Sequence, residues 1–394
     1  MLTPEENALL TEIGPGTPAG NLLRHYWYPI ATAGELSADH PTHFVRLLGE
    51  DLVLFQDGSG RVGLIQDHCP HRGCSLLYGR VEERGIACAY HGWLYDTTGS
   101  CLETPAEPAG SMFHLTVKAT AYPVQLFVGL YWAYLGPNPV PAIPHLDLWV
   151  RKDGHRKIYV QPQLDCNWFA AMENSVDPAH SRVLHSVGSA LRAGRPANTT
   201  RGATDEVEYF DFSETAIGIM KKRVSRNGHV DEHPLVFPNI LRHGNDTHIR
   251  VPMDDTHTRI YFVNFIPSPD GAAVEEDDAS LETIFLEDYK APTDRLHPFT
   301  RFTMHNTQPE DHMAWETQGP TADRTHERLA TSDRGIVMLR QMLRREIDKV
   351  AEGMEPINVY HDPAHPRVDT NHDAQMVEWA RNAARRGAGV ATGR

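Results

Sequence analysis

The chain has 394 residues, 40% of them hydrophobic, which is enough to bury the cores of two domains, or of one domain with a large insertion. Its formal net charge of −15 argues against nucleic acid as a partner. No apolar run reaches the roughly 18 residues of a membrane span, and the N-terminus lacks the basic flank and apolar stretch of a signal peptide. We therefore expect a cytoplasmic protein with no membrane partner, whose 5 cysteines are metal ligands or free thiols.

Residues 25–135 form short apolar stretches separated by Gly, Pro and Asp turns, which predicts a small all-β domain. The stretch VRLLGEDLVLFQDGSGRVGLIQ contains a hairpin with its turn at QDGSG. The four prolines of GPNPVPAIPHLDLW, which follows this domain, indicate a linker or a covering loop. The remaining residues, 1–24 and 136–394, are expected to form a second domain.

This second domain is predicted to begin with a strand in IYVQPQL and to continue as a helix from Asn167 through Pro178, which can kink it. Residues 206–268 favour strands, and the C-terminal third favours helices. In TSDRGIVMLRQMLRREIDKVAEG the apolar residues recur at helical spacing. Thr331 or Ser332 is the expected N-cap of this helix, and Gly353 is its expected stop.

Two mixed Cys-His pairs lie close together in the first domain, Cys69 with His71 in CPHRG and Cys88 with His91 in CAYHGW. Two thiolates and two imidazoles suit either a structural zinc or a Rieske 2Fe-2S cluster. A zinc finger pairs Cys with Cys and His with His around a helix, whereas here each pair mixes the two types on a short loop. The spacing therefore favours the cluster, with two thiolates on one iron and two imidazoles on the other.

A second metal motif lies in DPAHSRVLH, where Asp177, His180 and His185 have the pattern D-x2-H-x4-H. Two imidazoles and one carboxylate make the facial triad of non-haem Fe(II) oxygenases, which leaves coordination positions open for oxygen and substrate. Five residues of an ideal helix rotate about 500°, so the two imidazoles would point about 140° apart. One metal can bind both only if the helix is distorted or ends between them; otherwise they are ordinary surface histidines.

With these two motifs the chain resembles the oxygenase (alpha) subunit of Rieske non-haem iron aromatic ring-hydroxylating oxygenases, within them the phthalate 4,5-dioxygenase-like group. The stretches LTPEENALLTEIGPGTPAGNLLRHYWYP, VPMDDTHT and EDHMAWETQGPTADRTHERLATSDRGIVMLRQML extend the resemblance over most of the chain. It implies an α+β protein, with an all-β Rieske domain inserted in a helix-grip (START-like) catalytic domain that has an antiparallel sheet and C-terminal helices. It also implies a homotrimer or a dimer of trimers.

The family's third iron ligand is a carboxylate far downstream, and the resemblance assigns it to Asp311, with Glu310 and Glu316 as alternatives. The family also implies that Asp177 joins His180 to His91 of a neighbouring subunit, which makes Asp177 the predicted catalytic residue. The cofactors implied are a 2Fe-2S cluster and mononuclear Fe(II).

The cluster motif departs from that of respiratory-chain Rieske proteins. Cys74 stands where those proteins have a disulfide cysteine, but Tyr90 stands at its mate's position, so Cys74 is expected to be a buried free thiol. Trp93 replaces a serine that donates a hydrogen bond to the cluster, which predicts a lower reduction potential.

The resemblance implies a terminal oxygenase of aromatic hydrocarbon catabolism. It would use O2, and electrons from a separate flavin- or ferredoxin-type reductase that oxidises NAD(P)H, to hydroxylate an aromatic acid in a phthalate-like ring dihydroxylation. The chain has no G-x-G-x-x-G between a strand and a helix. O-demethylation or monooxygenation of a methoxy-aromatic acid uses the same ligands and stays open. A Rieske electron carrier is the alternative from another class, and the second metal motif argues against it.

A substrate carboxylate would need a cationic partner. The candidates are Arg250, Arg242 and the run Lys221-Lys222-Arg223. Asp254 and Asp255 in VPMDDTHT are expected to lie in a hairpin turn between strands and to bind no metal.

Overall fold

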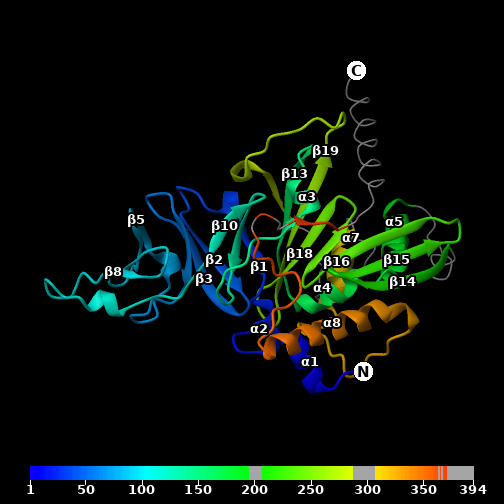
Figure 1. The fold of residues 1–394 in the computed structure, drawn as a ribbon, viewed down its shortest axis with the longest axis horizontal. Helices are drawn as coiled ribbons and strands as arrows, with labels where there is room; N and C mark the ends of the chain where they lie inside the picture. The colour runs from blue at the N-terminus through cyan, green and yellow to red at the C-terminus, as the bar shows by residue number, and fades with distance from the viewer. Residues whose placement is uncertain (195–205, 287–306, 363, 365–366, 371–394) are drawn as a thin grey trace. The chain divides into compact units, whose positions relative to one another are not determined.

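A computed structural model describes residues 1–194, 206–286, 307–362, 364 and 367–370 (Figure 1). The chain divides into two compact units. The small unit comprises Leu23–Pro141 with Glu276–Thr283, and the large unit comprises the other described residues. Within the described part of the chain, every helix is too short or too polar to cross a bilayer.

The small unit is built from short antiparallel strands in three sheets, which confirms the predicted all-β architecture. The predicted hairpin is formed by β3 (Glu50–Gln56) and β4 (Val62–Gln66), which are joined by the turn at QDGSG. The sheets are β1 (Trp27–Thr32), β11 (Leu130–Tyr134) and β10 (Val124–Phe127); β2 (Thr42–Leu47), β3 (Glu50–Gln56), β4 (Val62–Gln66) and β9 (Ala121–Tyr122); and β5 (Arg80–Glu82), β6 (Gly85–Ala87), β7 (Leu94–Tyr95) and β8 (Cys101–Glu103).

The core of the small unit contains two of the predicted cluster ligands. Cys69 and Cys88 are buried in one apolar cluster with side chains of β3, β4, β6 and β7, among them Phe55, Ile65 and Ile86. Because this packing fixes the start of both Cys-His loops, the fold positions the two motifs together.

The large unit is organised around one eight-stranded sheet, and the neighbouring strands from β14 through β19 to β13 are all antiparallel. Together with the C-terminal helices it confirms the predicted α+β class. In spatial order the strands are β14 (Val207–Thr215), β15 (Gly218–Ser225), β16 (Val230–Val236), β17 (Ile240–His243), β18 (Asp246–Pro252), β19 (Thr258–Pro267), β13 (Gly154–Leu164) and β20 (Glu282–Phe285). The strands β12 (His145–Leu146) and β21 (Arg367–Val368) form a separate parallel pair.

Helices pack on this sheet, α4 against β17 and β18 and α8 against β14 and β15, with α1 beside α8 (Figure 1). The C-terminal helix was predicted correctly, and Leu339, Leu343 and Ile347 form its buried face. The helices are α1 (Pro4–Thr11), α2 (Pro18–Leu23), α3 (Asp147–Val150), α4 (Trp168–Ser175), α5 (Ser186–Arg192), α7 (Thr307–Glu316) and α8 (Arg334–Ala351).

Two predicted helix boundaries differ in the structure. Helix α8 begins at Arg334 after a 3-10 turn, so its N-cap residue is Asp333 rather than Thr331 or Ser332. Gly353 does end it, with φ +76°. Helix α4 ends at Ser175, and the prediction that it continues through Pro178 is wrong. The residue before a proline is disfavoured in the α region, so Asp177 cannot readily continue the helix, which is capped at Val176.

A buried ion-pair network ties α4 to α8. Both oxygens of Glu173 accept hydrogen bonds from Arg324, and one also accepts a 2.7 Å bond from Nε of Arg340. Arg324 and Arg340 are 1% and 7% exposed. Since water cannot replace a lost partner at this depth, removing one member of the network should be strongly destabilising.

We expect Glu173→Gln to lower the free energy of unfolding by about 3 kcal/mol, because the buried guanidinium of Arg324 loses its counter-charge, while Arg340 keeps its pair with Glu327. The matched control is Glu214→Gln, which breaks the exposed pair with Arg345 and should cost less than about 1 kcal/mol. Urea unfolding followed by circular dichroism measures both values. Equal unfolding midpoints for the two variants would contradict this account.

Candidate metal centres

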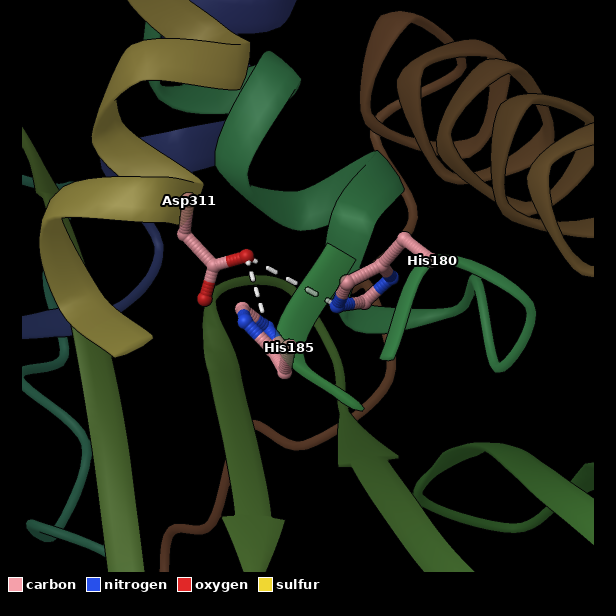
Figure 2. Close-up of side chains that lie close together, drawn as sticks. All are labelled: His180, His185 and Asp311. Atoms are coloured by element: carbon pink, nitrogen blue, oxygen red, sulfur yellow. Dashed lines mark ion pairs between the residues drawn. The ribbon is translucent and has the colours of Figure 1, made fainter. Parts of the chain in front are cut away.

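The three predicted iron ligands meet in the large unit. His180 and His185 bracket the π-helical turn η4 (Ser181–His185), and Asp311 lies on α7. Oδ1 of Asp311 is 3.7 Å from Nε2 of His180 and 3.1 Å from Nε2 of His185 (Figure 2). Among the described residues these three make the one cluster of His, Cys, Asp or Glu groups able to hold a single metal ion.

The π-helical turn explains how two histidines five residues apart face one point. Its hydrogen bonds run from residue i to i+5, as in the bond from the N–H of Ser186 to the carbonyl of Ser181. Residues five apart then lie nearly one above the other, instead of about 140° apart as on an α-helix. The distortion that the spacing required is therefore present, and the rings lie 5.3 Å apart at 84°.

The electrostatics of the three groups suit a cation. Burial raises the pKa of Asp311, but the hydrogen bond and charge of His185 lower it by more, so the carboxyl stays ionised. Burial lowers the pKa of His185, and the Asp311 and Glu310 carboxylates raise it by more. The proton that the His185 imidazole attracts in the free protein is one that a metal ion displaces on binding.

Each imidazole has a second carboxylate on its far side. Nδ1 of His180 lies 3.4 Å from Oδ2 of Asp177, whose other oxygen accepts the N–H of Ala179 at 2.8 Å. Nδ1 of His185 lies 2.9 Å from Oε2 of Glu310. Both rings therefore direct Nε2 toward Asp311 and Nδ1 toward an outer acid.

This arrangement separates the three acids that the sequence left as alternatives. Asp311 faces both Nε2 atoms, whereas Glu310 contacts only the outer nitrogen of His185. Glu316 accepts the backbone N–H of Asp165 at 3.0 Å and is not among the clustered groups.

A cavity of about 380 Å³ opens beside the three groups and is lined by His180, His185 and Asp311. Its volume lies in the range of small-molecule sites. Arg250 and Lys221 also line it, although they are only 3% and 8% exposed. Nε of Arg250 has no hydrogen-bond partner within the described part of the chain.

Each of the other predicted cationic side chains is paired with an acidic residue. Arg242 is buried outside the cavity and donates to Asp147 at 2.7 Å. Lys222 pairs with Glu232, and Arg223, which does line the cavity, pairs with Asp231 and donates to the hydroxyl of Ser181.

The predicted hairpin turn between β18 and β19 is confirmed. One carboxylate oxygen of Asp254 accepts from Thr256, inside the turn. Asp255 accepts the backbone N–H of Ile13 at 2.7 Å.

The predicted cluster ligands lie on two matching loops of the small unit. In the first, the N–H of Gly73 donates to the carbonyl of Cys69, and in the second the N–H of Gly92 donates to that of Cys88, both at 2.9 Å. Gly73 and Gly92 have φ of +74° and +72°, a conformation that favours glycine. The repeated geometry presents one Cys and one His from each loop.

The two cysteines and the two histidines differ in burial. Cys69 and Cys88 are 3% and 4% exposed, whereas His71 and His91 are half-buried with ring centroids 4.6 Å apart. Such a set suits two irons in different surroundings, a buried one held by thiolates and an outer one held by imidazoles.

The aromatic residues after His91 have roles that the sequence did not reveal. Trp93, expected only as a lost hydrogen-bond donor, stacks on His71 at 4.2 Å and 5°. The hydroxyl of Tyr95 lies 3.3 Å from Sγ of Cys69. Cys74 is a free thiol as predicted, although only partly buried.

We expect Tyr95→Phe to lower the reduction potential of the cluster by some tens of millivolts. A donor to a ligand sulfur stabilises the reduced, more negative cluster. A bond worth about 1 kcal/mol corresponds to a shift of about 40 mV, since tenfold, or 1.4 kcal/mol, is about 59 mV for one electron. Redox titration followed by EPR measures it, with the exposed Tyr78→Phe as control. A potential that is unchanged in Tyr95→Phe would show that this hydroxyl does not donate to the cluster.

The donor sets fit the two cofactors. Two buried thiols beside two half-exposed imidazoles match a 2Fe-2S cluster, and two Nε2 atoms converging on one carboxylate match mononuclear Fe(II).

Comparisons with known proteins agree with this arrangement. A Rieske [2Fe-2S] domain matches residues 26–123, and a LigXa C-terminal domain like family matches residues 285–379. The chain is 36% identical to the 5,5'-dehydrodivanillate O-demethylase oxygenase subunit of Sphingobium sp. (strain NBRC 103272 / SYK-6), over 92% of this chain and 85% of that protein. It is 34% identical to the phthalate 4,5-dioxygenase oxygenase subunit of Pseudomonas putida, over 87% of this chain and 85% of that protein.

Among solved structures, the oxygenase and ferredoxin complex of carbazole 1,9a-dioxygenase matches with a TM-score of 0.60 at 19% identity, over 82% of this chain and 90% of that chain. These similarities span both units, so the alternative of a Rieske electron carrier is wrong.

Proposed function

Because this chain belongs to the oxygenase subunits of the Rieske non-haem iron oxygenase family, which use a 2Fe-2S cluster and mononuclear iron, we propose that it hydroxylates an aromatic acid. The observation that carries the substrate class is the pair of buried cations, Arg250 and Lys221, in the cavity beside the clustered His and Asp groups. An aromatic acid carries a carboxylate on a flat apolar ring. This cavity offers cationic side chains for the carboxylate and apolar side chains for the ring.

The cluster is assigned to the domain 25–135, with Cys69 and Cys88 on one iron and His71 and His91 on the other. The mononuclear iron is assigned to His180, His185 and Asp311 in the catalytic domain formed by 1–24 and 136–394. When bound, the cluster supplies electrons one at a time and the mononuclear iron supplies the chemistry that activates O2.

The chain's own residues bind and orient the substrate. Arg250 on β18 and Lys221 on β15 belong to the same sheet and line the same cavity, and they would hold the carboxylate by charge-assisted hydrogen bonds. Phe262 and Ile260 of β19 line the same cavity and would contact the ring. A ring held at one end by its carboxylate presents its other carbons to the three clustered groups.

The catalytic role proposed for Asp177 is to connect the two metal centres. Its contact with Nδ1 of His180 supports one half of this bridge, and His91 of a neighbouring subunit would supply the other half. The proposal requires a homotrimer or a dimer of trimers. Electrons would come from a separate flavin- or ferredoxin-type reductase that oxidises NAD(P)H, since oxygenase subunits of this family work with a separate ferredoxin or reductase.

Removal of a methyl group from a methoxy-aromatic acid is the second candidate. It is supported by the 36% identity to an O-demethylase oxygenase subunit, which matches the identity to the phthalate enzyme. Both reactions need the substrate carboxylate to be bound in the same way and use the same proposed iron ligands. They therefore differ in their products.

The test is an assay of the purified protein with a separately supplied reductase against benzoic acids, phthalates and methoxybenzoic acids, each paired with its methyl ester. We expect O2 uptake with at least one acid and much less with its ester, and Arg250→Gln should raise KM about 10- to 100-fold. A cis-diol product identifies ring dihydroxylation, and formaldehyde identifies demethylation. Equal rates on acids and esters would refute binding of the substrate carboxylate by these cations. No O2 uptake with any aromatic compound would refute the function.

Lys221 predicts a particular pH dependence. Burial lowers the pKa of Lys221 to about 8, so its ammonium group is charged below that pH and loses its proton above it. We expect KM for the acid to rise as the pH increases through about 8, and Lys221→Arg to remove this rise because arginine stays charged. Lys222→Arg, at the neighbouring position paired with Glu232, is the control and should keep the wild-type profile. A KM independent of pH in the wild type would exclude Lys221 from binding.

A further inference from the structure

We propose that Glu310 is a positioning residue for the mononuclear iron: it accepts the Nδ1–H of His185 and so holds Nε2 of that ring toward the metal. The inference rests on the proposed iron site and adds to it a residue that does not touch the iron. It assigns two successive residues of α7, Glu310 and Asp311, to opposite sides of one imidazole.

The contacts of His185 define this role. Its Nδ1 lies 2.9 Å from Oε2 of Glu310, and its Nε2 lies 3.1 Å from Oδ1 of Asp311. A carboxylate on Nδ1 fixes the tautomer that leaves Nε2 free for a metal, and it makes that nitrogen a stronger ligand. Glu310 is 0% exposed, so the carboxylate is held in place without competition from bulk water.

The helix across from Glu310 provides space for it. Gly188 lies within α5, where glycine is less favourable than alanine. Its φ is not in the left-handed region, so no turn requires a glycine here. A Cβ added at Gly188 would overlap Oε1 of Glu310. The glycine therefore has a packing reason, which is the close approach of this carboxylate to the helix that follows His185.

Glu310 lies at the Nδ1 side of His185, as Asp177 lies at the Nδ1 side of His180. Oδ2 of Asp177 lies 3.4 Å from Nδ1 of His180, and its Oδ1 accepts the backbone N–H of Ala179. Glu310 makes the shorter contact. We infer that Glu310 sets the geometry of His185, whereas Asp177 is the acid proposed to face a second group.

The test compares metal binding in Glu310→Gln, Glu310→Ala and Gly188→Ala with the wild type. The readouts are the dissociation constant for Fe(II) and the visible spectrum of the protein loaded with Co(II) at this site. We expect affinity to fall about 10- to 100-fold in Glu310→Ala, less in Glu310→Gln, which keeps an acceptor oxygen, and to fall also in Gly188→Ala. The Co(II) spectrum should shift in all three variants while the cluster's EPR signal stays unchanged.

Two matched controls accompany these variants. Glu316→Gln alters a second buried acid of α7 that binds the backbone of Asp165, and Ser189→Ala alters the exposed residue next to Gly188. Both should bind Fe(II) as the wild type does. Wild-type affinity and spectrum in both Glu310 variants would overturn the inference.

His185→Ala separates this inference from the proposed function. If His185→Ala loses the metal while the Glu310 variants keep it, only the role of Glu310 is refuted. If His185→Ala also keeps the metal, the iron site itself is refuted.

Discussion

Replacing His180, His185 or Asp311 by alanine should remove the mononuclear iron and abolish turnover while the cluster's optical and EPR signals persist. Each residue is one of the three proposed protein ligands, and with two ligands left the open site should not retain Fe(II). The core around Cys69 and Cys88 is built from side chains of the small unit, so this core and the cluster loops should remain intact. Iron analysis and EPR on the same sample measure both results.

Glu316→Ala is the control for this experiment, because Glu316 lies on the same helix as Asp311 but outside the clustered groups. It should keep the iron. Retention of both iron and activity in Asp311→Ala would move the ligand to another acid, and Glu310 is then the nearest replacement because it already contacts His185.

Asp177→Asn should keep both metal centres and the oligomer but slow electron transfer between them by at least about 100-fold. The carboxylate of Asp177 lies at the Nδ1 side of His180, on the opposite side of the ring from Asp311. An asparagine has one acceptor oxygen and no charge, so it cannot offer a separate anionic oxygen to each of two imidazole N–H groups as the proposed bridge does.

The measurement is stopped-flow reoxidation of the reduced cluster with substrate and O2. We expect a cluster that reduces at the normal rate and reoxidises very slowly. The control is Asp254→Asn, an acid confined to the β18–β19 turn. Wild-type reoxidation in Asp177→Asn, or activity in an isolated single subunit, would contradict the bridge.

Much of the fold could be predicted because its signals are local. Alternating strands with Gly and Asp turns specified the all-β unit, and the apolar spacing of the last helix specified its buried face. The missed elements had weaker signals. Helix α1 begins with a capping box between Thr3 and Glu6, which the T-x-x-E pattern of the sequence contains, but its few apolar residues give it no clear helical period.

The site was predicted in composition but not in geometry. The spacing of His180 and His185 conflicts with an α-helix, and sequence alone does not specify the π-helical turn that resolves the conflict. Glu310 and Asp311 are equivalent in sequence, and only the orientation of α7 relative to the turn distinguishes them. Lys221 is one residue of a charged run, and its burial in the cavity depends on the sheet as a whole.

One chain should hold both a Rieske cluster and a mononuclear iron. The decisive measurement is iron and acid-labile sulfide per chain, determined together on the anaerobically loaded protein. We expect two cluster irons with two sulfides, plus one further iron that His180→Ala removes while both sulfides remain. Only the two cluster irons in the wild type, or a further iron that persists in His180→Ala, would contradict it.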